Sequence, residues 1–265
     1  MRVYLELARR SFAQQFAYRG ATLAGLFTNS IFGVMIASVF LALYRSNPDV
    51  NGEIAGWRAT ETLTYVWISQ SLLMVVYLWG WWEIMLSIQT GAIVADFLKP
   101  LDFYAYWLSR DLGRAAAHAL IRGVPTFLVG ALLFRQMVIP GELGRWLAFL
   151  VSVVLAVSVS FAFRFILNMA GFWVIDHRGV AYMGTVLVNF FSGLLVPLTF
   201  FPGWLETVAN LLPFRAIIMI PIELLLGQRS VFSGIALQLF CFGALSVIAR
   251  LLLRAGERKV VIQGG

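Results

Sequence analysis

Long hydrophobic runs recur along the whole sequence, and polar residues gather in short breaks between them. A helix needs about 20 predominantly apolar residues to cross the hydrocarbon core of a bilayer. The runs that meet this length are Ala21–Tyr44, Leu63–Trp82, Ala115–Phe134, Leu147–Phe172, Val180–Thr199 and Val231–Leu253. The pattern therefore predicts an all-α, polytopic membrane protein with six transmembrane helices in a single domain, residues 1–265.

Composition supports a membrane protein. With 60% hydrophobic residues, 12% charged residues and a mean hydropathy of +0.84, the chain has too few charges to cover a water-soluble globule. The net charge of +7 does not indicate nucleic-acid binding, because the basic residues stand at the ends of hydrophobic runs and form no long stripe. The single cysteine, Cys241, can form no intrachain disulfide.

The basic residues also predict the topology. An even number of spans puts both termini on one side of the membrane, and short cytoplasmic loops are enriched in Lys and Arg. With both termini in the cytoplasm, 14 of the 20 Lys and Arg residues lie inside. Residues 1–20 carry apolar positions at helical spacing between arginines, which predicts an interfacial helix before the first span.

The longest polar break, Ser87–Arg114, predicts a short amphipathic helix followed by a second helix. One face of the first helix is apolar, and its residues are Ile93, Val94, Phe97 and Leu98. Pro100 ends this helix, and Asp102 is placed to cap the next one. Two interpretations remain open on the pattern alone: a docking surface for a soluble subunit, or an interfacial helix with arginines that reach to water.

Several polar residues fall near the predicted ends of spans. A cationic stripe enters the third span at every fourth residue and consists of Arg110, Arg114, His118 and Arg122. Arg164 and Asn168 are one turn apart in the fourth span, and at 1.5 Å per residue Arg164 is about 25 Å from the outer end, where it is expected to reach the inner interface. The aromatic run Tyr77–Trp82 predicts an interfacial belt. Four acids are also expected near interfaces, which leaves no buried proton relay: Glu83, Asp96, Asp111 and Asp176.

Short, proline-broken hydrophobic pieces follow the fifth span over residues 200–229. They are too short to cross a bilayer, so we expect extracellular re-entrant helices that dip into the outer leaflet. On their pattern alone they form either a cap over the helix bundle or an outer gate.

The residues needed for common catalytic chemistry are missing. The sequence has no GxxxxGK[ST] phosphate-binding loop, so the chain is not expected to bind ATP by that route. Its two histidines, His118 and His177, are too isolated for a metal cluster, and His118 is expected to be a satisfied interfacial residue. We therefore expect no enzyme activity, no metal and no cofactor in this chain.

Two segments resemble the permease subunits of type-2 ATP-binding-cassette (ABC) transporters, most closely the bacterial branch with six spans in a free-standing chain. Thr90–Leu101 is similar to the family's cytoplasmic segment after the second span, with a glycine near its start and a Leu-x-Pro-Leu ending. Pro197–Phe214 is similar to the family's "P…FP.WL…lP" pattern before the last span. Together the segments stand in the expected order among the predicted spans.

The resemblance implies a half-transporter in the bacterial cytoplasmic (inner) membrane. Its partners would be a second permease, identical or a sister protein, and two cytoplasmic ABC ATPase subunits that bind ATP and Mg. Within residues 88–114 it implies a coupling helix that inserts into the ATPase, with the candidate residues Gly91, Ile93, Val94, Phe97, Leu98, Pro100 and Leu101. It also implies an outer gate, with the candidate residues Pro197, Phe200, Phe201, Pro202, Trp204 and Pro213.

On this basis we expect the pore-forming permease of an ATP-driven exporter. The competing expectation is a passive channel or a membrane scaffold that works without an ATPase. An adjacent gene for a cassette ATPase would distinguish the two. No charge pattern in the sequence identifies a substrate.

Overall fold

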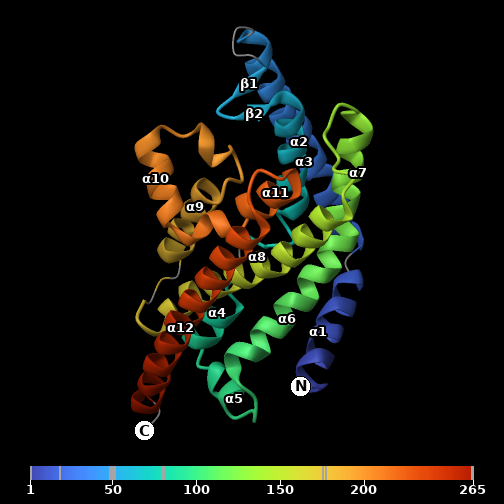
Figure 1. Ribbon diagram of the computed structural model, residues 1–265. Coiled ribbons are helices and arrows are strands. Elements are labelled where there is room, and N and C mark those ends of the chain that lie inside the picture. Colours follow the sequence, from blue (N-terminus) through green and yellow to red (C-terminus); the bar gives the residue numbers. More distant parts are fainter. Residues whose placement is uncertain are drawn as a thin grey trace.

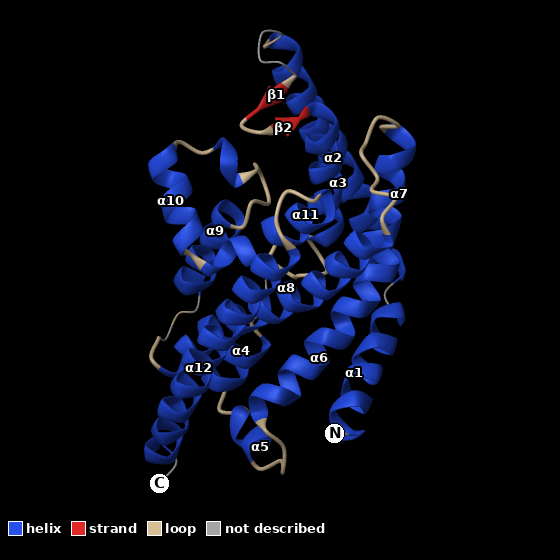
Figure 2. Ribbon diagram, viewed as in Figure 1, coloured by secondary structure: helices blue, strands red, loops and turns tan. Residues whose placement is uncertain are grey.

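The structure is a computed structural model that describes residues 2–17, 19–47, 52–78, 81–174, 176 and 178–263. Figure 1 shows the arrangement of its elements, and Figure 2 shows that they are almost all helices. The α-helices are α1 (Arg2–Gln14), α2 (Arg19–Ser46), α3 (Ala59–Leu72), α4 (Glu83–Gln89), α5 (Ile93–Phe97), α6 (Phe103–His118), α7 (Val124–Leu133), α8 (Leu143–Met169), α9 (Arg178–Phe191), α10 (Gly203–Leu211), α11 (Met219–Leu226) and α12 (Val231–Gln263).

Short elements connect these helices. The 3-10 turns are η1 (Gln15–Ala17), η3 (Ala170–Phe172), η4 (Leu198–Phe200) and η5 (Pro213–Ala216), and η2 (Ala119–Gly123) is a π-helical turn. Strands β1 (Glu53–Ile54) and β2 (Trp57–Arg58) form a small antiparallel hairpin. Its turn holds Ala55 and Gly56 at positive φ angles of 51° and 80°, as a tight two-residue hairpin requires.

The predicted all-α membrane fold is confirmed. In the described part of the chain, 4 helical stretches are long and apolar enough to cross a membrane: Thr22–Ser46, Phe103–Leu133, Leu143–Phe172 and Val231–Lys259. They coincide with the first, third, fourth and sixth predicted spans. The total of six spans stays a prediction.

The second and fifth predicted spans are not continuous helices. α3 ends at Leu72 rather than Trp82, because side chains of α6 and α8 bind the backbone carbonyl groups that follow. α9 ends at Phe191 rather than Thr199, because Gly193 adopts a left-handed φ of 78° and Pro197 follows. The hydroxyl of Tyr65 in α3 donates a hydrogen bond to the carbonyl oxygen of Gly193, so this turn is also tied to the core.

α8 is the central helix of the molecule. It packs against α6, α11 and α12 and runs obliquely through the middle of the bundle (Figure 1). α11 is buried along its whole length beside α8. Gln238 of α12 accepts a hydrogen bond from Ser152 of α8 at 2.8 Å and donates to the Ala216 carbonyl oxygen at 2.8 Å. This buried amide therefore links α12, α8 and η5 with its own polar atoms satisfied.

α1 lies along α6, at the end of the molecule where both chain ends lie (Figure 1). The predicted helix within residues 1–20 is present over Arg2–Gln14, and Leu5 on its outer face is 70% exposed. Gly113 permits the close approach of the two helices, because the backbone of Ala8 fills the space that a Cβ would take. The Ser11 hydroxyl donates to the Arg110 carbonyl oxygen at 2.7 Å, which fixes the register of the pair.

We expect Gly113→Ala to displace α1 from α6, because the added methyl group would overlap the Ala8 backbone. A displaced α1 opens more often, so trypsin should cleave after Arg9 and Arg10 of the detergent-solubilised protein at least about threefold faster. Gly144→Ala in α8 is the matched control, since a Cβ there meets nothing within 4 Å. Equal cleavage rates for Gly113→Ala and Gly144→Ala would show that the contact does not hold α1 in place.

Candidate functional site

The segment from α4 to the start of α6 forms an exposed loop at the same end of the molecule as the two termini (Figure 1). Gly91, at a left-handed φ of 75°, lets the chain reverse between α4 and α5. Its N–H donates to the Ile88 carbonyl oxygen at 3.1 Å, and its own carbonyl oxygen accepts from the N–H of Val94 at 3.3 Å. The predicted short helix is therefore α5, and we call Gly91–Leu101 the coupling loop after the role expected for it.

The apolar residues of the coupling loop divide into an outward and an inward set. Leu98 is 81% exposed and Val94 is 45% exposed. Ile93 is fully buried, and the ring of Phe97 packs edge-on against Phe103 with centroids 5.2 Å apart. Gly91 and Pro100 are exposed and Leu101 is half-buried. A protein partner can therefore reach Leu98 and Val94, whereas Ile93 and Phe97 hold α5 onto the rest of the chain.

Asp102 connects the coupling loop to three helices, and its predicted capping role is confirmed. Its carboxylate accepts from the N–H of Ala105 at 2.7 Å, which caps α6, and binds Arg250 of α12 at 2.8 Å. Its own N–H donates to the hydroxyl of Tyr4 in α1 at 3.2 Å. Partial burial works to raise the pKa of Asp102, but the Arg250 guanidinium and the Ala105 N–H hold it below its usual value. The link is therefore charged at neutral pH.

A buried ion cluster of Asp111, Arg114 and Arg164 joins α6 to α8. Asp111 lies 2.7 Å from Arg164 and 2.8 Å from Arg114, and none of the three side chains is more than 11% exposed. The expectation that the Arg164 side chain extends to water at the interface is therefore wrong, because it is 5% exposed and paired with Asp111. The position of the four acids near interfaces stays a prediction. Arg164 can be buried because it pairs with the Asp111 carboxylate. This pairing offsets the solvation free energy that a buried arginine loses, whereas an unpaired arginine would extend toward water.

Arg114 also holds the part of the chain that leaves the helical path after α3. We call this part, residues 73–78 and 81–82, the helix break. The two terminal nitrogens of Arg114 donate to the carbonyl oxygens of Met74 at 2.8 Å and Val75 at 3.0 Å. A carbonyl group released from a helix inside a membrane must find a donor from the protein, and Arg114 supplies two.

α8 supplies further donors to the helix break. The Ser160 hydroxyl donates to the Val76 carbonyl oxygen at 2.7 Å, and the Asn168 amide donates to the Trp81 carbonyl oxygen at 2.9 Å. The side-chain oxygen of Asn168 accepts a hydrogen bond from the N–H of Met85 at 2.9 Å, near the start of α4. These bonds explain why α3 does not continue to Trp82. The available signal in the sequence was the spacing of Ser160, Arg164 and Asn168, which makes a polar stripe along one face of α8.

Tyr77 occupies the centre of the helix break. Its φ is +52°, an uncommon backbone state for a residue other than glycine, and its ring lies 4.5 Å from the Arg114 guanidinium and 5.3 Å from that of Arg164. Trp81 also lies over Arg164, at 5.4 Å. Tyr77 and Trp81 thus pack on the ion cluster, and the interfacial belt stays a prediction. Trp79 and Gly80 of the predicted belt lie outside the described residues.

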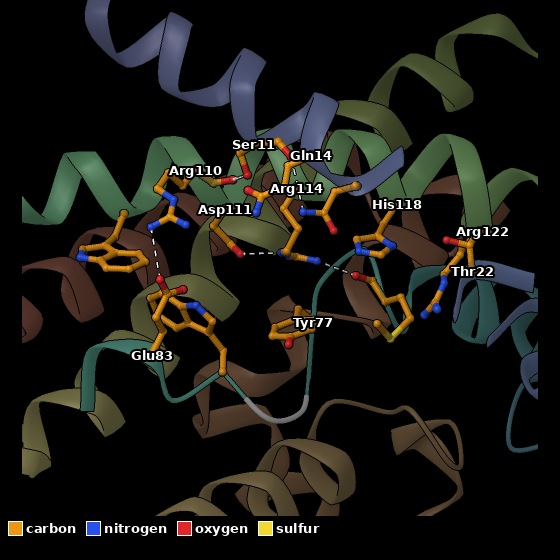
Figure 3. Close-up of a pocket in the computed structure, with 14 residues that line it drawn as sticks. Ser11, Gln14, Thr22, Tyr77, Glu83, Arg110, Asp111, Arg114, His118 and Arg122 are labelled. Atoms are coloured by element: carbon orange, nitrogen blue, oxygen red, sulfur yellow. Dashed lines mark hydrogen bonds and ion pairs between the residues drawn. The ribbon is translucent and has the colours of Figure 1, made fainter. Parts of the chain in front are cut away.

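A polar cavity of about 350 Å³ lies between α1, α6 and the helix break. Figure 3 shows the predicted cationic stripe along one wall of it: Arg110, Arg114, His118 and Arg122. Arg110 stacks on Trp107 at 4.5 Å and lies 3.5 Å from Glu83. The stripe therefore faces a cavity inside the chain. His118 is 8% exposed and its Nδ1 has no hydrogen-bond partner in the described structure, so the expectation of a satisfied histidine is wrong.

Residues 197–229, which we call the outer segment after the position expected for them, lie at the end of the bundle away from the two termini (Figure 1). Phe200 packs edge-on against Phe40 of α2 with centroids 5.9 Å apart, and Phe201 stacks on Phe190 of α9 at 5.0 Å. Trp204 is 70% exposed. Of the three candidate prolines, Pro197 is buried, Pro202 is exposed, and Pro213 is half-buried at the start of η5. The candidate gate residues therefore lie close together in the chain but do not form one closed plug.

A second buried ion cluster holds the outer segment to α11. The Glu223 carboxylate binds Arg215 of η5 and lies 2.5 Å from Arg229, which precedes α12. Glu223 is 4% exposed, so these arginines are needed to compensate its buried charge. No group of His, Cys, Asp and Glu that could hold a metal ion occurs among the residues that the structure describes.

A comparison of the sequence with protein-family models gives one match. The model described as "ABC-2 family transporter protein" covers residues 32–264 of the chain, which include the helix break, the coupling loop and the outer segment. No curated protein and no solved structure matches the chain significantly.

We expect Asp111→Asn to destabilise the protein by about 3–5 kcal/mol, because it leaves Arg164 and Arg114 as buried charges without a carboxylate. The midpoint of thermal unfolding in detergent should fall by several degrees. Glu206→Gln, which changes a half-buried acid on α10, serves as the control. If Asp111→Asn unfolds at the same temperature as Glu206→Gln, the ion cluster does not hold α6 to α8.

Proposed function

This chain belongs to the ABC-2 family of transporter proteins and is a membrane permease of an ABC transporter, and on that premise we propose that it forms the pore of an ATP-driven exporter. ATP and Mg bind to separate cytoplasmic ATPase subunits, and a second permease, identical or a sister protein, completes the path. The membrane is the bacterial cytoplasmic (inner) membrane, with both termini in the cytoplasm. The absence of a phosphate-binding loop in the sequence supports a separate ATPase.

The observation that carries the proposal is the exposed apolar surface of the coupling loop. Leu98 and Val94 project from the end of the molecule that carries both termini, next to the ion pair of Lys99 with Asp96. Hydrogen bonding to Asp96 raises the pKa of Lys99, which keeps the Lys99 ammonium charged at physiological pH. An apolar tip beside charged groups matches the anatomy of a protein interface, with an apolar centre and a polar rim. We assign the ATPase contact to this tip.

The coupling loop is connected to the membrane part by a short path. Asp102, four residues after Leu98, caps α6, and the same helix carries Asp111 and Arg114. Arg114 donates to the carbonyl oxygens of the helix break. A displacement of the loop by the ATPase would move α6 as a rigid rod, and this motion would reach the helix break through Arg114 and α8 through Asp111. Two helical backbone bonds run into the helix break, from the N–H of Leu73 to Ser69 and from the N–H of Val76 to Leu72, and side chains of α6 and α8 bind its carbonyl groups. An element held largely by side chains is suited to act as a hinge.

Export is supported by the position of the polar cavity. Its walls are α1, α6 and the helix break, which lie in the half of the molecule that carries the coupling loop. At the other end of the bundle, Phe200 packs on Phe40 and Phe201 stacks on Phe190. We assign the outer gate to these two rings, and we assign exposed Trp204 to the contact with the second permease.

We expect Leu98→Glu to weaken binding of the ATPase at least about tenfold, because a carboxylate would have to be desolvated in an apolar contact. Phe97 is left unchanged in this test, since it packs on Phe103 and its loss would disturb α5 itself. The readout is the amount of ATPase that co-purifies with the full-length permease. Leu211→Glu, an equally exposed leucine at 83% on α10, is the control, and unchanged co-purification of Leu98→Glu would remove the docking assignment.

We expect Phe201→Ala to raise the passive leak of small solutes through the reconstituted transporter several-fold, because it removes the ring that stacks on Phe190. The basal ATPase rate should rise with it, since the outer end then opens at a lower energetic cost. Phe232→Ala changes a ring that is 86% exposed on α12 and should do neither. An unchanged leak and an unchanged ATPase rate in Phe201→Ala would leave the segment a structural cap.

A further inference from the structure

We propose that the apolar pocket between α3, the π-helical turn η2, α7 and α8 holds the end of an acyl chain of a membrane lipid. The pocket has a volume of about 190 Å³ and shares no lining residue with the polar cavity beside α1. This binding site goes beyond the transport function. It rests on the chemistry of the pocket walls, the surroundings of the pocket mouth and the size of the pocket.

The side chains that line the pocket offer a ligand no free hydrogen-bond donor. None of the described residues on its walls is charged, and the two with a polar side chain are Ser71 and Trp146. The Ser71 hydroxyl donates to the Trp67 carbonyl oxygen at 2.7 Å, and the indole N–H of Trp146 donates to the Pro140 carbonyl oxygen at 2.8 Å. Water needs polar partners in a cavity, so these walls favour an apolar ligand.

The pocket is closed on one side and open on the other. Its inner wall includes Leu72 at the end of α3 and Val75 in the helix break, which are 4% and 3% exposed. Its rim includes Val124 of α7 and Leu150 of α8, which are 50% and 57% exposed. A ligand that enters past the rim therefore reaches the helix break.

The surroundings of the mouth identify hydrocarbon as the medium that it faces. Each rim residue belongs to a candidate membrane span and stands between exposed apolar residues one helical turn away. Leu120 and Leu128, at 58% and 52%, lie on either side of Val124. Leu147 and Val154, both at 55%, lie on either side of Leu150. Apolar stripes on membrane spans face acyl chains, so the mouth opens toward the chains of the bilayer.

The proposed contact with the second permease leaves this mouth open. That contact is assigned to Trp204 of α10, and Figure 1 shows α10 on the opposite side of the molecule from α7 and the start of α8. A helix of another protein would in any case be too wide to enter, since a helix with its side chains is about 10 Å across. The occupant is therefore a narrow apolar group.

The size of the pocket fits the end of one hydrocarbon chain. An apolar protein cavity of about 150 Å³ stays dry and binds benzene, and the pocket of about 190 Å³ is of the same order. An empty pocket in a membrane protein loses the dispersion contacts that its walls could make. The last carbons of an acyl chain restore these contacts, and no hydrogen bond is lost when they enter.

The test uses phosphatidylcholine that carries a photoreactive diazirine near the end of one acyl chain, in liposomes with the reconstituted full-length permease. After irradiation, mass spectrometry identifies the labelled residues. We expect label on Leu72 and Val75, which are buried and which a chain reaches only by entering the pocket, as well as on exposed Val154. Label on Val154 without label on Leu72 or Val75 in the wild-type chain would overturn the proposal.

Two variants test whether the chain enters through this pocket. Val153→Phe should lower the labelling of Leu72 and Val75 at least about threefold, because the larger ring takes up space in the pocket. Val154→Phe, the same change at an exposed neighbour that does not line the pocket, should leave it unchanged. Ala119→Leu narrows the pocket from η2 and replaces Val153→Phe if that variant fails to fold. Labelling at the wild-type level in Val153→Phe and Ala119→Leu would overturn the site.

A free aromatic diazirine of about the size of benzene distinguishes a lipid chain from another apolar ligand. We expect the phosphatidylcholine probe to label Leu72 and Val75 whether or not the free probe does so. If only the free probe labelled these two residues, the pocket would take small apolar molecules and the assignment to a lipid chain would be wrong.

Discussion

A backbone that leaves the helical path between membrane helices must receive hydrogen bonds from the protein, because lipid supplies none. In this chain the constraint applies after Leu72, where α3 ends. The carbonyl oxygens of Met74 and Val75 are bound by Arg114, that of Val76 by Ser160, and that of Trp81 by Asn168. Each donor comes from α6 or α8, so the helix break, α6 and α8 depend on one another for their polar groups.

The ion cluster makes this arrangement possible. Arg114 can be buried only because Asp111 compensates its charge, and Asp111 can be buried between two arginines because it bonds to both. Replacing such a cluster by apolar residues often costs a protein little, whereas removing one partner costs much. A cluster that only joined helices could have been apolar. Here its donors also hold irregular backbone, which apolar side chains cannot do, and this gives the charges a structural purpose.

The fold could be predicted from the sequence where one hydrophobic run forms one helix. α2, α8 and α12 follow directly from the length and hydropathy of their runs, and the Pro100–Asp102 pattern correctly predicts the end of one helix and the cap of the next. The end of α3 could not be predicted in this way. The run from Leu63 to Trp82 is as apolar as a span, and what stops the helix is the set of donors on α6 and α8, which are distant in the sequence.

The candidate site could be predicted only in part, because its contacts also come from residues that are distant in the sequence. The spacing of Arg110, Arg114, His118 and Arg122 correctly predicts one helical face, but a spacing contains no information about what that face meets. α1 covers it, because Gly113 lets the Ala8 backbone approach. In the coupling loop the apolar pattern likewise groups Ile93 with Leu98, although one is buried in the chain and the other is 81% exposed. Burial of this kind depends on neighbours that only the three-dimensional structure identifies.

The central claim is that the ATPase acts on the helix break through α6, and hydrogen–deuterium exchange tests it most directly. The measurement compares the amides of residues 73–78 in the reconstituted complex of permease and ATPase, with and without trapped ATP, and uses the buried helix α11 as an internal reference. The account predicts that ATP changes exchange in residues 73–78 several-fold while α11 stays constant. Unchanged exchange in residues 73–78 in a complex that still transports its substrate would contradict the account.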